Sequence, residues 1–180
     1  MNRRRFLISI TGIVAASPLA LRQPLATTLP LETVVAGLTM AQWQTIELVQ
    51  EHLFPAERNH LHNTPGAKDI HAATYLQSVL NEPRHDPADR DFLRKGLIQL
   101  QSITKKESGQ TFEQLSHSQR DAVLRKLEQA PDGRHWISML LEYIMEALLT
   151  DPVYGGNPHG IGWQWLQHQA GFPRPPRISG

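Results

Sequence analysis

The chain has 180 residues, the length of an average domain, and 40% of them are hydrophobic, enough for one buried core. Eighteen Lys and Arg face seventeen Asp and Glu, but four of the arginines fall in the first 25 residues, which hold no acid. The rest of the chain is therefore mildly acidic, without the concentrated positive charge that nucleic-acid binding requires. The absence of Cys excludes disulfides, thiol catalysis, Cys-ligated zinc or iron–sulfur sites and covalent c-type haem attachment in this chain.

Residues 1–28 are typical of an export signal. A basic start runs into a weakly apolar stretch that is shorter than the roughly 20 residues needed to span a bilayer as a helix. An arginine pair followed by x-Phe-Leu resembles the bacterial twin-arginine signal, with Arg3, Arg4, Phe6 and Leu7 as its residues. A Sec-type signal or an uncleaved anchor is the alternative. Because the twin-arginine route carries folded proteins, this leader indicates folding before export.

After a Pro-containing, extended linker over residues 29–37, the pattern over 38–180 predicts one all-α domain of about five helices. The first helix begins at a Thr39–Gln42 capping box and is stopped by Pro55, and the second covers about Lys68 to Leu80. The later helices begin at Asp86, at a second capping box formed by Ser116 and Gln119, and at Asp132.

The segment from Trp136 to Leu149 is the most hydrophobic part of the body. It is apolar nearly all round, so we expect it at the centre of a helical bundle. Only Ser138, Glu142 and Glu146 interrupt it.

The segment from 151 to 171 changes character, because Gly and Pro recur too often for a helix to continue and two of the four Trp fall within it. We expect an irregular Gly/Trp-rich loop, followed by a stiff, extended tail from Phe172 to Arg177. Two interpretations remain open. The loop either wraps over the bundle as a structural element, or presents Tyr154, Trp163 and Trp165 to a partner, since aromatic residues often dominate interface energy.

Residues with catalytic or metal-binding potential are scattered. The nine His include His60-x-His62 in a polar loop, but no helical His-x-x-x-His or His-Glu-x-x-His pair, so we expect solvent-facing or core-edge histidines. Glu142 and Glu146 share a helix face and could form a carboxylate pair for acid–base work or metal binding, although each could instead face water. No hydrolase Ser motif is present. We predict no catalytic, cofactor or metal site in this chain.

Three stretches resemble a known family, the small subunit (subunit 3) of bacterial gluconate 2-dehydrogenase and related membrane-associated sugar and polyol dehydrogenases. The first is the Arg3-Arg4-x-Phe6-Leu7 leader, and the second runs from Leu38-Thr39 through Phe54-Pro55 to Pro65-Gly66-Ala67. The third and most specific one is made of Asp151, Pro152, Tyr154, Gly155, Gly156, Asn157, Gly162 and Trp163. We call the residues of this third stretch, together with Trp165, the C-terminal motif.

The resemblance implies a non-catalytic subunit of a periplasmic, flavin-dependent sugar or sugar-acid dehydrogenase complex. In such a complex a large GMC-type subunit binds FAD, and a multihaem cytochrome c subunit passes electrons to the membrane quinone pool. The small subunit carries the twin-arginine signal, engages the twin-arginine translocase, and brings the FAD subunit to the outer face of the inner membrane. No FAD or haem c is expected in this chain itself.

The alternative hypothesis comes from the residues alone. It is a stand-alone periplasmic helical metal-binding protein or enzyme that uses its His and Glu side chains.

Overall fold

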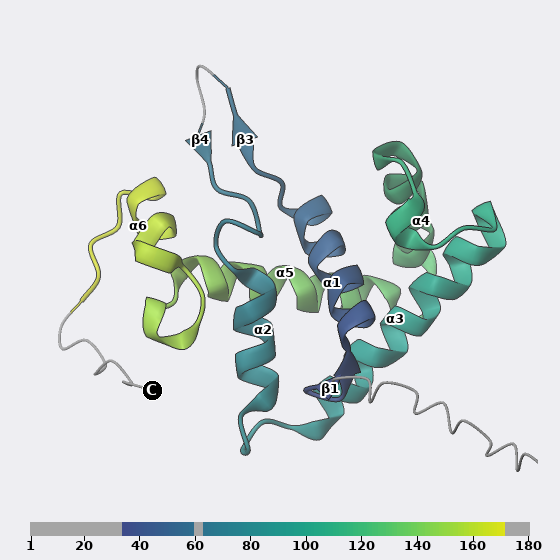
Figure 1. The fold of residues 1–180 in the computed structure, drawn as a ribbon, viewed down its shortest axis with the longest axis horizontal. Coiled ribbons are helices and arrows are strands. Elements are labelled where there is room, and N and C mark those ends of the chain that lie inside the picture. The colour runs from purple at the N-terminus through teal and green to yellow at the C-terminus, as the bar shows by residue number, and fades with distance from the viewer. Residues whose placement is uncertain (1–33, 60–62, 172–180) are drawn as a thin grey trace, which may run out of the picture. The chain divides into compact units, whose positions relative to one another are not determined.

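The computed structural model describes residues 34–59 and 63–171, and this part of the chain is mostly helical, as predicted (Figure 1). Its α-helices are α1 (Met40–Leu53), α2 (Ala72–Asn81), α3 (Pro87–Ser108), α4 (His117–Gln129), α5 (Gly133–Leu149) and α6 (Ile161–Trp165). Three short 3-10 helices are η1 (Phe112–Gln114), η2 (Pro152–Tyr154) and η3 (Pro158–Gly160). Two antiparallel hairpins pair β1 (Val34–Val35) with β2 (Leu38–Thr39), and β3 (Glu57–Arg58) with β4 (Asn63–Thr64). The all-α class is confirmed.

Both predicted capping boxes are confirmed. At the start of α1, the Thr39 hydroxyl accepts from the Gln42 N–H at 3.2 Å and the Gln42 amide oxygen accepts from the Thr39 N–H at 2.9 Å. Ser116 and Gln119 exchange the same two bonds at the start of α4. Asp86 caps α3 by accepting from the Ala88 N–H at 2.9 Å. Each bond satisfies a backbone group that a helix end leaves without an intrahelical partner.

One predicted cap and one predicted helix start differ in the structure. Asp132 stands at the N-cap position of α5, but its backbone is left-handed, with φ of 61°, and its side chain makes no cap bond. The second helix begins at Ala72 instead of Lys68, because residues 66–71 form turns that end in a left-handed His71, with φ of 57°. A left-handed residue cannot continue an α-helix, so both helices begin after it.

The predicted linker ends in a hairpin. Val35 pairs with Leu38, and both turn residues, Ala36 and Gly37, have the positive φ that suits a two-residue hairpin turn. The Trp43 indole N–H donates to the Val35 carbonyl at 2.9 Å, which holds the hairpin on α1. Residues 34–37 therefore pack on the helical domain.

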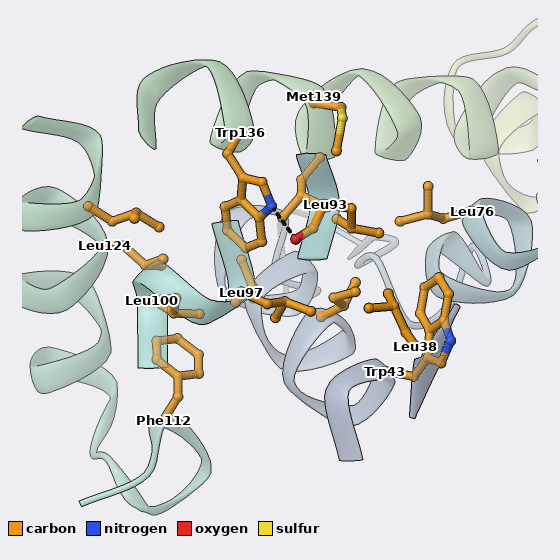
Figure 2. Packing of buried hydrophobic residues seen from close by; sticks show 14 of the residues in the cluster. Leu38, Trp43, Leu76, Leu93, Leu97, Leu100, Phe112, Leu124, Trp136 and Met139 are labelled. Carbon is orange, nitrogen blue, oxygen red and sulfur yellow. Dashed lines mark hydrogen bonds between the residues drawn. The ribbon is translucent and has the colours of Figure 1, made fainter. Parts of the chain in front are cut away.

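Helix α5 contacts α1, α2, α3, α4 and α6 and lies across the other helices (Figure 1). Figure 2 shows the Trp136 side chain directed from α5 toward α3, where its fully buried indole N–H donates to the Leu93 carbonyl at 3.0 Å. The core continues from Trp136 through leucines of α3 to Phe112 on one side and to Leu38 and Trp43 on the other. The central place predicted for α5 is confirmed.

One face of α5 is not buried. Leu141, Met145 and Leu149 are exposed, although the sequence predicts a helix enclosed on all sides. These residues recur at every fourth position and so share a single face. Glu142 and Glu146 are exposed beside them.

Candidate functional site

The C-terminal motif begins with a tight reversal after α5. The Asp151 carboxylate accepts from the Val153 N–H at 3.1 Å, and Pro152 fills the first position of η2. Gly155, at φ of +92°, ends this turn in a conformation that side chains disfavour. The expected irregular loop is thus a series of short helical turns, η2, η3 and α6, separated by left-handed residues.

Asn157 is the buried centre of this segment. It is 0% exposed, its side-chain N–H donates to the Thr150 carbonyl at 3.0 Å, and its side-chain oxygen accepts from the Gly162 N–H at 2.7 Å. Its backbone N–H donates to the Ile70 carbonyl at 2.9 Å, just before α2. One residue therefore joins the end of α5, the entry to α2 and the start of α6.

Two motif glycines allow close contact with α5. A Cβ added to Gly162 would lie 2.1 Å from the Leu148 carbonyl oxygen, and one added to Gly156 would lie 2.8 Å from the Ala147 carbonyl oxygen. Both positions are buried. Since neither these glycines nor Asn157 face solvent, their role is to seat the segment on α5.

Two aromatic residues of the motif reach solvent. Tyr154 is 53% exposed and Trp165 is 40% exposed, with the Trp165 ring edge-on to Phe54 at 6.4 Å between centroids. Trp163 is half-buried, and its indole N–H donates to the Leu149 carbonyl at 2.8 Å. The buried part of the motif is thus structural, and Tyr154 and Trp165 form its outer surface.

The exposed face of α5 directly precedes the motif in the chain. Leu149, 53% exposed, ends α5 and is followed within five residues by Tyr154. We call Leu141, Met145, Leu149, Tyr154 and Trp165 the exposed apolar set. Sequence reasoning missed its three α5 members. The signal was the spacing of Glu142 and Glu146, which follow Leu141 and Met145 by one position and mark the side of the helix that faces water.

Of the two candidate carboxylates on α5, Glu146 has a partner on another helix. The Glu146 carboxylate accepts from the Tyr75 hydroxyl at 3.0 Å and so ties α5 to α2. Burial, together with this bond and the charge of Glu146, raises the pKa of Tyr75 to about 12. Tyr75 therefore stays protonated and keeps donating throughout the physiological range.

A cavity of about 500 Å³ adjoins Tyr154 and is partly lined by Tyr75, Ser78, Arg84, His85 and Thr150. The His85 ring lies 3.0 Å from the Asp89 carboxylate.

Histidines meet at one place in the described residues. The His52 and His117 rings lie 4.4 Å apart, and the His52 Nε2 lies 3.8 Å from the Asp121 carboxylate. Residues 34–59 and 63–171 contain no group of three His, Asp or Glu arranged to hold a metal ion. His60 and His62 lie outside the described residues, as do Arg3, Arg4, Phe6 and Leu7.

No helix in the described residues has both the length and the apolar character needed to cross a bilayer.

The fold and motif together define a small helical domain with a structured C-terminal segment and an exposed apolar surface. A family model described as gluconate 2-dehydrogenase subunit 3 matches residues 40–171, and the chain belongs to that family. The match covers all six helices and the entire C-terminal motif. None of the curated proteins and none of the solved structures compared with the chain matches it.

Proposed function

We propose that this chain is the non-catalytic small subunit of a periplasmic flavin-dependent sugar or sugar-acid dehydrogenase, needed for export and assembly of the large FAD-containing subunit. Membership of a family described as a dehydrogenase subunit carries the proposal. The reaction and its cofactors, FAD in the GMC-type large subunit and haem c in a multihaem cytochrome, belong to the partner chains.

The exposed apolar set is the proposed docking surface for the large subunit. Large apolar side chains that remain exposed are candidates for burial at an interface, and aromatic anchors often supply much of the binding energy. Tyr154 and Trp165 are the anchors, with Trp163 bonded behind them to the end of α5. The buried motif residues hold these anchors in place before the partner arrives.

The leader supplies the export signal in this proposal. Arg3 and Arg4, followed by Phe6 and Leu7, would direct the assembled pair to the twin-arginine translocase, which accepts folded cargo. The large subunit would then cross the membrane without a signal of its own. The complex would act at the outer face of the inner membrane.

Export is tested by replacing Arg3 and Arg4 together with Lys. We expect the flavoprotein to accumulate in the cytoplasm, because the translocase reads the arginine pair as a pair. Immunoblots measure how the flavoprotein is distributed between periplasmic and cytoplasmic fractions. Arg22→Lys, in the same leader, is the matched control. Equal periplasmic flavoprotein in both variants would reject the twin-arginine assignment.

Assembly is tested separately by affinity purification of the full chain from its own host. We expect a large protein to co-elute with flavin fluorescence in proportion to this chain. Elution of this chain alone, from cells that contain the active dehydrogenase, would overturn the assembly role whatever the route of export.

A further inference from the structure

Methionine is the side chain most readily oxidised by peroxide in this chain, which contains no Cys. The residues that the structure describes hold three methionines: Met40 at the start of α1, and Met139 and Met145 on α5. Met139 is 8% exposed and packs in the core, among the residues drawn in Figure 2. Met40 is 48% exposed and Met145 is 41% exposed. Peroxide therefore reaches Met40 and Met145 in the folded chain, whereas Met139 is shielded.

Met145 lies at the middle of the exposed face of α5. Leu141 precedes it by one helical turn, Leu149 follows it by one turn, and both are exposed. The thioether of Met145 is apolar and flexible, which suits a surface that adapts to a partner. A change of chemistry at this sulfur therefore falls within the exposed apolar set, between two of its leucines.

Oxidation of the thioether by hydrogen peroxide transfers one oxygen atom to sulfur. The sulfur loses two electrons and becomes a sulfoxide, the O–O bond breaks, and the second oxygen leaves as water. The side chain changes from apolar to polar. Because the carboxylates of Glu142 and Glu146 are exposed on either side of Met145 in the sequence and repel anions, a neutral peroxide is the class of oxidant that fits.

The sulfoxide oxygen would find no hydrogen-bond donor among its helical neighbours. The residues three and four positions from Met145 on either side are Leu141, Glu142, Leu148 and Leu149. Three of them are aliphatic, and the Glu142 carboxylate accepts hydrogen bonds but donates none. Water satisfies the sulfoxide oxygen while the face is open. Under a partner surface that fits a thioether, the same oxygen is buried without a donor, which costs binding free energy.

We propose that Met145 is a site of reversible oxidation by peroxide that controls docking of the large subunit. The thioether form binds the partner, and the sulfoxide form binds it weakly. A sulfoxide reductase that uses a dithiol restores the thioether, because the dithiol becomes a disulfide and the oxygen leaves as water. This inference rests on the proposed function and adds a regulation of its docking surface. It concerns the unassembled chain, since a docked partner covers Met145.

The site of oxidation is tested by peptide mass spectrometry of the full chain after graded treatment with hydrogen peroxide. We expect one added oxygen at Met40 and at Met145, and none at Met139 over the same exposure. The urea midpoint should stay unchanged, because both oxidised side chains already face water. If Met145 resisted a treatment that oxidised Met40 completely, the proposal would be overturned.

Docking is tested with the flavoprotein subunit separated from the complex of its own host. The tagged full chain, untreated or treated with peroxide, retains this subunit, and flavin per chain is quantified. We expect treatment to weaken binding by about tenfold or more, as burial of one unpaired polar group does. Sulfoxide reductases with dithiothreitol should restore it.

Two leucine variants assign the effect to one sulfur. Met145→Leu should bind the flavoprotein as the untreated chain does and should keep binding it after treatment. Met40→Leu is the matched control, because it removes the other exposed methionine and retains Met145. It should lose binding on treatment as the original chain does.

Equal binding before and after complete oxidation of Met145 would overturn this inference and leave the proposed function standing. So would loss of binding by the treated Met145→Leu variant, because another residue would then be responsible. Binding that stayed weak after removal of the sulfoxide would also overturn it. Absence of binding by the untreated original chain would reject the proposed function itself, and this inference with it.

Discussion

Asn157 holds the C-terminal segment in place with two side-chain hydrogen bonds and a left-handed backbone. Asn157→Ala leaves the Thr150 carbonyl and the Gly162 N–H without these partners. We expect a loss of about 2–3 kcal/mol in the free energy of unfolding, measured by urea denaturation. Asn157→Gly removes the same bonds but relieves the backbone, so it should be the milder change. An Ala variant as stable as the original chain would show that the segment does not depend on these bonds.

His52 makes stability depend on pH. Burial and the charge of His117 lower its pKa below the ordinary value, and Asp121 opposes this only in part, while Arg120 adds to it. In the unfolded chain His52 titrates at its ordinary pKa, near 6.5. As pH falls through that value, the unfolded chain takes up a proton that the folded chain resists, so stability falls.

The measurement is the urea midpoint between pH 7.5 and pH 5. We expect His52→Gln to lose less stability over that range than the original chain does. His135→Gln, at an exposed histidine of α5, is the comparison variant. If the urea midpoint changed with pH equally in the original chain and in the His52 variant, His52 would not be the source of the pH dependence.

At the scale of elements, the crossing of α3 and α5 depends on Gly96. A Cβ there would lie 2.0 Å from the Trp136 ring. Gly96→Ala improves helix propensity by about 1 kcal/mol, but moving the indole would break its bond to Leu93 and overpack the core.

We expect overpacking to outweigh propensity, with a net loss of about 2 kcal/mol by thermal or urea unfolding. Ser102→Ala, at an exposed position of the same helix, should change stability by less than about 0.5 kcal/mol. A Gly96→Ala variant more stable than the original chain would mean that the indole has room to move.

The sequence predicted elements best where the signal was local. The capping residues Thr39, Asp86 and Ser116 act on backbone groups two or three positions away, so the helix starts they predict hold in the structure. Asp132 is an aspartate like Asp86, but its backbone is left-handed and its side chain makes no cap bond. The late start of α2 likewise follows a left-handed residue, His71.

What the sequence could not predict was set by packing between distant segments. The burial of Asn157 depends on Ile70, far away in the chain, and the exposure of Leu141 and Met145 depends on how far the other helices cover α5. Composition alone described α5 as apolar all round. The sequence therefore could not predict which residues of α5 and of the C-terminal motif face solvent.

At the scale of the whole molecule, the exposed apolar set predicts how a partner binds. We expect Leu141→Gln combined with Met145→Gln to leave stability nearly unchanged, since both side chains already face water, and to reduce co-purification of the flavoprotein. Quantified flavin per chain in the eluate measures the effect. Ile98→Gln, at an exposed apolar residue on α3, is the control. Equal flavin recovery from the two variants would move the interface away from α5.

The contrast between buried and exposed tryptophans has a practical consequence. Trp43 and Trp136 are buried in the core, whereas Trp165 is exposed at the surface. A collisional quencher dissolved in the buffer, such as acrylamide, will reach Trp165 first and leave Trp136 shielded until the chain unfolds. Quenching of the tryptophan fluorescence therefore follows two events separately. Access to Trp136 reports unfolding of the core, and protection of Trp165 reports the binding of a partner over it.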